Sequence, residues 1–290
     1  MPAWTDLGDG VLVRQSRAYQ MNSTVVVHEG RALVFDPGVL PSELADIAAV
    51  VERHVPRFEN VTLVFTHPHW DHVLGKPWFP LASTVAHVGF ADEVERDAAK
   101  IDADAKAYVE GAGEPWPRPF EAFEPALKLR GTVGLRIGER ELIAYDMPGH
   151  SPSQQSFYLP EIGLFVAGDT LSDIEIPWLD GPPWVYRRSL QALHWVFEQE
   201  QVKFLVPGHG AVARGRTDAY KRLLRDIDYL LLLEGEVGKA FTKGWSLADT
   251  QAELAKMGFV GKDAAYSMND VHRDNVTHTY EGLLEQADLK

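Results

Sequence analysis

The sequence predicts an α/β fold built from two similar halves and followed by a helical extension. Strands and helices alternate up to about residue 215, and the chain is mainly helical after Arg216. VTLVFTHPH resembles VKFLVPGHG, and LVFDPG resembles LFVAGDT, so each half contains an apolar strand followed by a loop with His and an apolar strand that ends at an Asp and a Gly. Two such halves facing each other would bring these strand ends to one rim, where open α/β sheets bind ligands. We therefore predict one α/β domain over 1–215, with the expected site at its rim, and a helical extension over 216–290 that packs on it.

The first half predicts strands rich in branched apolar residues and helices with an apolar face. The strands 21–28 and 31–36 are joined at Glu29-Gly30. Ser42 is the expected N-cap of the next helix, on which apolar residues recur at helical spacing. The remaining expected elements are a buried strand over 61–66, a turn or short helix from Trp70 that Pro77 ends, a strand over 83–89, a charged helix over 90–110 and an irregular Pro- and Gly-rich connection over 111–125.

The second half repeats this alternation before the chain becomes helical. Turns at Gly138-Glu139 and at 161–163 separate strands over 135–137, 141–148, 155–159 and 163–169. Ser189 is the expected N-cap of a helix. The other expected elements are a loop over 176–188, a helix over 189–200, a strand over 202–210, and helices over 218–237, 246–257 and 269–286.

Composition excludes several classes of function. The chain has 290 residues, no cysteine and a formal net charge of -14. The absence of cysteine excludes disulfides, a thiol nucleophile and thiolate ligands, so His and carboxylates would have to hold any metal, which suits zinc, iron or manganese. The acidic balance argues against a nucleic-acid partner. Because no apolar run approaches membrane-spanning length and MPAWTDLGDG has no signal-peptide pattern, we expect a cytoplasmic protein with a small-molecule substrate and no membrane partner. The oligomeric state stays open.

The stretch HPHWDH at 67–72 is the strongest chemical signal. His67 and His69 are separated by one residue, so both imidazoles point to the same side of an extended segment and can reach one ion. Asp71 and His72 follow as the chain turns and can reach a second ion nearby. Four ligands from one short loop fit a single tetrahedral centre poorly. The stretch therefore predicts two ions that residues elsewhere in the chain complete.

Three later residues have the same context. His150 lies in PGHS, Asp169 in AGDT and His209 in PGHG, each after an apolar strand and beside glycine. A glycine neighbour permits a sharp bend and leaves space for an ion. A lone histidine at a strand end is more often structural. Because the first cluster is incomplete without partners, however, we predict all three as ligands, with the two oxygens of Asp169 able to bridge two cations.

THPHWDH, PGHS, GDT and PGHG, in this order, resemble the metallo-β-lactamase superfamily of hydrolases. The resemblance covers roughly residues 10–215. It implies a four-layer αββα sandwich with a dinuclear site at the sheet edges. It also implies one metal on His67, His69 and His150, a second on Asp71, His72 and His209, with Asp169 bridging them. Asp36 in VFDPG matches the aspartate of the first motif, which would hydrogen-bond a ligand or the loop beneath it.

The branch of the superfamily is narrowed by residue type. True β-lactamases lack the bridging aspartate, so Asp169 resembles the branch of glyoxalase-II-type thioesterases, lactonases and phosphodiesterases. His69 stands where flavodiiron proteins carry Glu, which argues against an oxygen-reducing di-iron enzyme. Ser172 stands where related lactonases often carry Tyr, so the lactonase pattern is incomplete. The basic residues with which glyoxalase II recognises glutathione near its C-terminus have no match in the last seventy residues. We rank hydrolysis of a small ester or thioester first, a lactonase second, a phosphodiesterase third, a nuclease lower and a metal-stabilised binding module last.

The predicted mechanism uses two divalent ions, zinc first, with iron or manganese as alternatives. A hydroxide that bridges them would be the nucleophile, because a metal lowers the pKa of bound water from 15.7 to about 7. One ion would polarise the carbonyl and the other would stabilise the leaving group. Asp71 is both a ligand and the carboxylate expected to accept the proton of the nucleophile.

Aromatic loops and the C-terminal helix supply the candidates for the substrate pocket. The residues considered are Trp70, Trp178, Trp184, Tyr186, His272 and Asn275. Packing between loop and helix is the alternative for the aromatic residues, and fastening of the C-terminal helix is the favoured alternative for His272 and Asn275. Lys76, Arg187 and Arg188 could anchor an anionic group, but solvated surface charge is the preferred interpretation.

Overall fold

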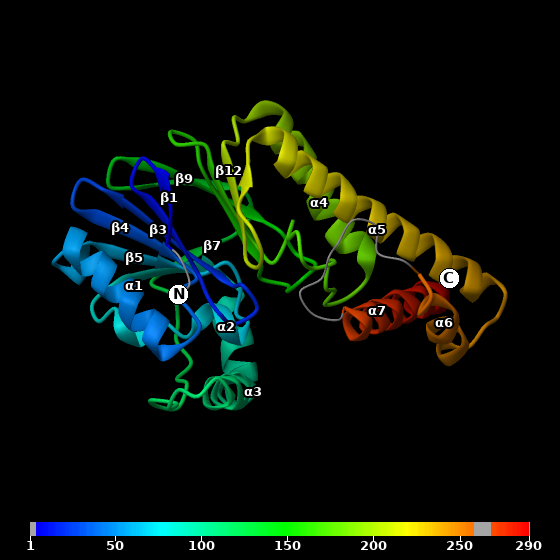
Figure 1. The fold of residues 1–290 in the computed structure, drawn as a ribbon. Coiled ribbons are helices and arrows are strands. Elements are labelled where there is room, and N and C mark those ends of the chain that lie inside the picture. The colour runs from blue at the N-terminus through cyan, green and yellow to red at the C-terminus, as the bar shows by residue number, and fades with distance from the viewer. Residues whose placement is uncertain (1–3, 258–267, 290) are drawn as a thin grey trace.

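Two β-sheets stacked face to face form the centre of the molecule, and helices cover the outer face of each sheet. The structure is a computed structural model that describes residues 4–257 and 268–289. Figure 1 shows α1 on one side of the stacked sheets and α4 and α5 on the other. The predicted four-layer αββα sandwich is therefore confirmed.

The first sheet has the order β1-β2-β3-β4-β5-β6-β7 in the described residues. Its strands β4, β5 and β6 are parallel, so their carboxyl ends meet at one edge. The seven strands are β1 (Trp4–Gly8), β2 (Val11–Gln15), β3 (Asn22–His28), β4 (Arg31–Phe35), β5 (Val61–Val64), β6 (Ser83–His87) and β7 (Leu127–Leu129). Strands β1, β2 and β7 have no counterpart among the elements expected from the sequence.

The second sheet has the order β13-β12-β11-β10-β9-β8 in the described residues. β11 and β12 are parallel, and their carboxyl ends lie at the same edge of that sheet. The six strands are β8 (Val133–Ile137), β9 (Arg140–Asp146), β10 (Gln155–Leu159), β11 (Leu164–Gly168), β12 (Phe204–Pro207) and β13 (Ala213–Arg214).

Helices connect and cover the strands. They are α1 (Pro41–His54), η1 (Phe58–Asn60), α2 (Trp70–Val73), η2 (Lys76–Trp78), α3 (Phe90–Gly111), α4 (Pro183–Gln199), α5 (Arg216–Thr242), α6 (Leu247–Leu254) and α7 (Asn269–Asp288). Leu40 rather than Ser42 caps α1, because Pro41 occupies the first turn. Likewise α4 begins at Pro183, so Ser189 lies inside this helix and donates to the Pro148 carbonyl.

Apolar side chains form a core between the sheets and another on each outer face. Phe35, Phe157 and Val166 are among the buried residues that join the two sheets. Leu44 of α1 and Phe90 of α3 pack on the outer face of the first sheet. The outer face of the second sheet packs against α4, α5, α6 and α7 in one continuous cluster. The C-terminal helices therefore share a core with the second sheet.

Both sheets meet at the edge where their parallel strands end. The Gln155 amide donates to the Thr66 carbonyl, and Asn22 donates through Nδ2 to the Pro207 carbonyl. These bonds tie the loop after β5 to the second sheet and the loop after β12 to the first. The loops that follow β4, β5, β9, β11 and β12 thus come together at one rim.

Candidate metal centre

All seven predicted ligands lie at this rim. They form two compact groups, in each of which the donor atoms lie within 4.8 Å of one another: His67, His69, His150 and Asp169 in the first, and Asp71, His72 and His209 in the second. His67 and His69 follow β5, whereas Asp71 and His72 lie on the short helix α2. These two groups match the division of ligands that the resemblance implies.

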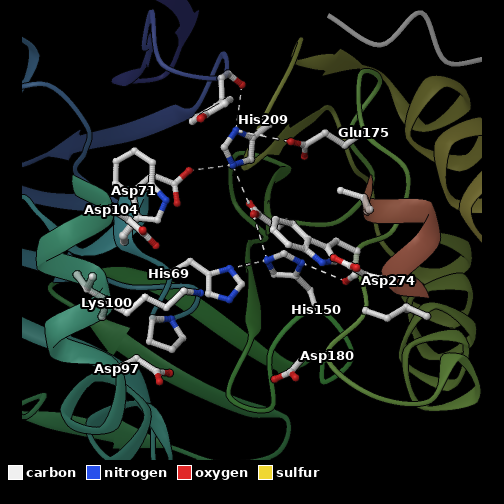
Figure 2. A pocket seen from close by; sticks show the side chains of 18 of the residues that line it. His69, Asp71, Asp97, Lys100, Asp104, His150, Glu175, Asp180, His209 and Asp274 are labelled. Atoms are coloured by element: carbon white, nitrogen blue, oxygen red, sulfur yellow. Dashed lines mark hydrogen bonds and ion pairs between the residues drawn. The ribbon is translucent and has the colours of Figure 1, made fainter. Parts of the chain in front are cut away.

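The first group is arranged around the Asp169 carboxylate. Asp169 Oδ2 lies 3.2 Å from His150 Nε2 and 3.6 Å from His67 Nε2. His150 Nε2 lies 2.8 Å from His69 Nδ1, and the two ring planes are tilted 74° to each other; Figure 2 shows this contact. Three ring nitrogens and a carboxylate oxygen therefore converge on one point.

The second group lies on the other side of the same carboxylate. Asp169 Oδ1 is 3.1 Å from His72 Nε2, and Asp169 Oδ2 is 3.4 Å from His209 Nε2. His209 Nε2 also lies 3.3 Å from Asp71 Oδ2. Asp169 is thus in contact with both groups, which is the position that a bridging carboxylate would occupy.

Four of the five imidazoles are held from behind through Nδ1. These nitrogens contact oxygen atoms at 3.0–3.2 Å, namely Thr66 Oγ1 for His67, Asp36 Oδ2 for His72, the Trp178 carbonyl for His150 and the Tyr19 carbonyl for His209. A carbonyl or carboxylate oxygen can only accept, so at least the last three rings donate from Nδ1. Each Nε2 then presents its lone pair to the centre, as in metal sites whose ligands are oriented by outer hydrogen bonds.

Asp36 organises the loop beneath the ligands. Its Oδ1 accepts from the Thr66 amide at 2.7 Å, and its Oδ2 accepts from Thr66 Oγ1 at 2.6 Å and from His72 Nδ1 at 3.0 Å. The side chain is almost completely buried. One carboxylate therefore fixes both the start of the HPHWDH loop and the orientation of a ring on α2.

The glycines that precede His209 and His150 allow close approach at Asp169 and at Tyr186. A Cβ atom at Gly208 would lie 1.9 Å from Asp169 Oδ1, far inside contact distance. Gly149, with φ near +146°, lies against Tyr186, and a Cβ there would be 2.4 Å from the Tyr186 ring. The glycines before His150 and His209 are thus required for close approach, as their sequence context suggested.

The donor atoms are arranged for cations. His67 Nε2 and Asp169 Oδ1 are buried and form no hydrogen bond. His72 Nε2 and His209 Nε2 face each other at 3.4 Å, although both rings donate from their other nitrogen. Lone pairs that face one another in a buried site require protons or metal ions between them. Nitrogen and carboxylate ligands without sulfur suit zinc, iron or manganese, so the residues fit the expected metals.

Burial and charge divide the histidines. Burial, followed by the positive charge of His150, lowers the pKa of His69 to about 3, and burial beside His72 holds the pKa of His67 well below its usual value. Burial also acts to lower the pKa of His72 and of His209. Carboxylates outweigh this effect and raise both pKa values, chiefly Asp169 for His72 and Glu175 for His209. His67 and His69 are therefore neutral at neutral pH, with ring nitrogens able to bind a cation.

A cavity of about 590 Å³ opens above the two groups. Trp70 and Trp178, two of the predicted pocket residues, line it together with Tyr19. The Trp178 ring lies 6.5 Å from the His69 ring and 6.2 Å from the His150 ring. Tyr19 and Trp70 meet edge to face at 6.3 Å on the side of Asp71. Aromatic rings thus flank both groups of ligands.

Trp184 and Tyr186 do not line this cavity, contrary to the prediction. Both lie on α4, because Pro183 starts the helix earlier than the expected loop allows. Trp184 packs beside Gly282 of α7. Tyr186 is fully buried, and its hydroxyl donates to the Asp169 carbonyl at 2.8 Å. It supports a ligand-bearing turn from below.

His272 and Asn275 are also absent from the cavity wall, because they face the core from α7. His272 bonds to the Tyr229 hydroxyl and to the Leu254 carbonyl, both at 3.0 Å. Asn275 accepts from the Leu179 amide at 3.0 Å and donates to the Pro177 carbonyl at 2.6 Å. The two residues fasten α7, and Asn275 also anchors the loop that carries Trp178.

The basic candidates lie outside the cavity. Arg187 forms an ion pair with Glu234 of α5 at 2.7 Å, Arg188 is exposed on α4, and Lys76 lies over the Phe123 ring. Ser172 is buried, and its Oγ accepts from the Ile174 and Glu175 amides at 3.1 Å.

Several residues that line the cavity were not predicted from the sequence. Glu175 lies 4.0 Å from His209 Nδ1, and burial, together with the nearby Asp169 and Asp71 carboxylates, raises its pKa to about 7. Acidic side chains of α3, α7 and the loop before α4 also reach the cavity. They carry no motif, because what brings them together is the packing of helices far apart in the sequence.

The family model described as Metallo-beta-lactamase superfamily matches residues 17–231. A curated relative, "Probable metallo-hydrolase YqgX" from Bacillus subtilis (strain 168), is 24% identical over 160 residues, which are 52% of this chain and 66% of that protein.

Solved structures show the same fold. The sec-alkylsulfatase Pisa1 from Pseudomonas sp. superposes with a TM-score of 0.74 at 16% identity, over 100% of this chain and 52% of that one, so this chain spans about half of the sulfatase. A metallo-beta-lactamase family protein from Thermus thermophilus gives a TM-score of 0.67 at 17% identity, over 97% of this chain and 95% of that one.

Proposed function

This chain belongs to the metallo-β-lactamase superfamily, and from that premise we propose that it is a hydrolase with two divalent metal ions that cleaves a small ester or thioester. The observation that carries the proposal is the Asp169 carboxylate, which contacts histidines of both ligand groups. A carboxylate between two groups of nitrogen donors supports a pair of ions, and we propose zinc for both. It also supports the glyoxalase-II-like branch over true β-lactamases.

The ligands would divide as the two groups do, with Asp169 shared. When bound, such ions supply acidified water and polarise the bond to be broken. The protein orients the histidines from behind and places the aromatic rings of Trp70 and Trp178 beside the centre. Asp71, whose Oδ2 faces the centre beside His209 Nε2, would accept the proton of the attacking water.

The charge of the cavity supports an ester or thioester over a phosphodiester. Among the described residues, Arg96 and Lys100 are the Arg and Lys side chains of its lining. Arg96 is already bound to Asp97, with a contact of 2.6 Å. The carboxylates Glu93, Asp97, Asp104, Glu175, Asp180 and Asp274 of the same lining would repel the negative charge of a phosphodiester.

A substrate panel on protein loaded with zinc or manganese tests this function. Thioesters, aryl esters, lactones and phosphodiesters would be compared with a chelated sample as control. We expect turnover of one ester or thioester series that is lost on chelation and restored by metal. Equal background rates for every class, unchanged by chelation, would contradict the proposal and favour a metal-stabilised binding module.

A further inference from the structure

Two helices that are distant in sequence face each other across the metal-centre cavity. α3 contributes Asp97, Lys100 and Asp104, and α7 contributes Asp274 and His278. The spacings of three, four or seven residues within each set place its side chains on one face of the helix. Figure 2 shows Asp97, Lys100 and Asp104 along one wall and Asp274 on the other, with His69 and His150 between them.

The wall of this cavity is acidic beyond its metal ligands. Apart from Asp71 and Asp169, its carboxylates are Glu93, Asp97, Asp104, Glu175, Asp180 and Asp274, and its Arg and Lys side chains are Arg96 and Lys100. Arg96 and Asp97 neutralise each other. Apart from Glu93 and Glu175, three aspartates, Asp104, Asp180 and Asp274, then line the cavity against one lysine, Lys100.

These three aspartates have no ion-pair partner in the described parts of the chain. The side chains of Asp104, Asp180 and Asp274 all line the cavity, and none of them forms a salt bridge there. By contrast Asp270, on the same helix as Asp274 but outside the lining, pairs with Arg273 at 3.1 Å. On α7, Asp274 on the cavity side is thus uncompensated, whereas Asp270 outside the cavity is compensated.

The same cavity has the other features of a cation site. Tyr19, Trp70 and Trp178 line it, and aromatic faces attract ammonium groups by cation–π interaction. A cavity with aromatic and acidic walls favours a ligand with a positive charge.

We propose that the substrate of this centre carries an ammonium group, which the acidic and aromatic wall between α3 and α7 holds while the metal centre receives the bond to be cleaved. The inference rests on the proposed hydrolase function and deepens it, because it adds the charge of the substrate. It also excludes anionic esters, such as acyl groups carried on acidic thiols, as preferred substrates.

A pair of matched substrates tests the inference on the zinc-loaded protein. Acetylthiocholine and its carbon isostere 3,3-dimethylbutyl thioacetate have the same shape and differ by one charge. We expect kcat/KM to be about tenfold higher for the cationic thioester, given the modest strength of partly solvated ion and cation–π contacts. Equal values for the two thioesters would overturn the inference and leave the hydrolase function standing.

Calorimetry tests the cationic site by binding alone, independently of hydrolysis. Choline and 3,3-dimethyl-1-butanol would be titrated into the zinc-loaded protein, and we expect choline to bind about tenfold more tightly. Tighter binding of choline without hydrolysis of either thioester would contradict the proposed bond type and support the cationic site. Indistinguishable binding of the two alcohols would overturn the cationic site.

Variants that remove one negative charge identify the carboxylates that bind the ammonium group. D104N and D274N, alone and together, should reduce the preference for choline over its isostere while leaving the binding of the isostere unchanged. D270N is the matched control on α7 and should retain the full preference, because Asp270 lies outside the cavity. An undiminished preference in the double variant would overturn the assignment of these aspartates.

Discussion

Four of the five imidazoles of the centre are oriented by an oxygen atom behind the ring. His72 is held by the Asp36 carboxylate, whereas His150 and His209 are held by the Trp178 and Tyr19 carbonyls. The motif predicts the rings, because residue types and spacing are local. It cannot predict the two carbonyls, since any residue supplies one and only the fold brings it into place.

Replacement of Asp36 by Asn tests the outer support of a ligand. We expect zinc affinity to fall by about 10- to 100-fold, because His72 loses its charged acceptor. The affinity would be measured by competition with a chromogenic chelator. D46N is the control, because Asp46 accepts from Trp4 and Arg14 away from the centre. Zinc affinity that is equal in D36N and D46N would refute the role of Asp36.

Tyr186 offers a second test at this scale. Y186F removes the hydroxyl that donates to the Asp169 carbonyl, so we expect a loss of about 1 kcal/mol in unfolding free energy together with weaker zinc binding. Y158F is the matched control, since Tyr158 is also buried and donates to the Gln201 carbonyl. The control should lose stability in urea without loss of zinc affinity, and the same pattern in Y186F would show that Tyr186 is only structural.

At the scale of elements, hydrophobic patterning predicted most helices and the central strands. β4, β5 and α3 lie close to their expected ranges, because each has a strong apolar period. Strands β1 and β2 were missed, since their short segments alternate with glycine and charged residues. The start of α4 was misplaced, because a proline pair resembles a loop although proline is favoured in the first helical turn.

Asn275 couples α7 to the substrate pocket. N275A would leave the Leu179 amide and the Pro177 carbonyl unpaired in a buried setting, so we expect a loss of about 3 kcal/mol in unfolding free energy. Because this loop carries Trp178, KM should also rise for the substrate found in the panel. T279V is the control, as Thr279 donates within α7 to the Asn275 carbonyl. Equal KM values in both variants would disprove the anchoring role.

At the scale of the whole molecule, the cavity arises between parts that no local pattern connects. The ligands come from both sheets, whereas the acidic walls come from α3 and α7. The sequence was sufficient to predict that the seven candidate ligands lie together at one rim, because their positions follow from strand ends in a repeated α/β plan. It was insufficient for the walls, because the position of α7 depends on long-range packing with α4 and α5. No helix in the described ranges combines the length and apolar character needed to cross a membrane.

The shared core predicts that the C-terminal helices and the sandwich unfold together. Leu230, Leu233 and Val276 lie in the same buried cluster as Phe165 and Leu205 of the second sheet. We therefore expect a single calorimetric transition for the intact chain, with equal calorimetric and van't Hoff enthalpies. Two separate transitions would show instead that residues 216–290 form an independent unit.

The central claim is a pair of metal ions bridged by Asp169, and metal content tests it most directly. Wild-type protein and D169N would be loaded with zinc, desalted and analysed by inductively coupled plasma mass spectrometry, with turnover measured on the same samples. We predict two zinc ions per chain in the wild type, and fewer ions together with lower turnover in D169N, because Asp169 contacts both ligand groups. Two retained ions and undiminished turnover in D169N would contradict the account.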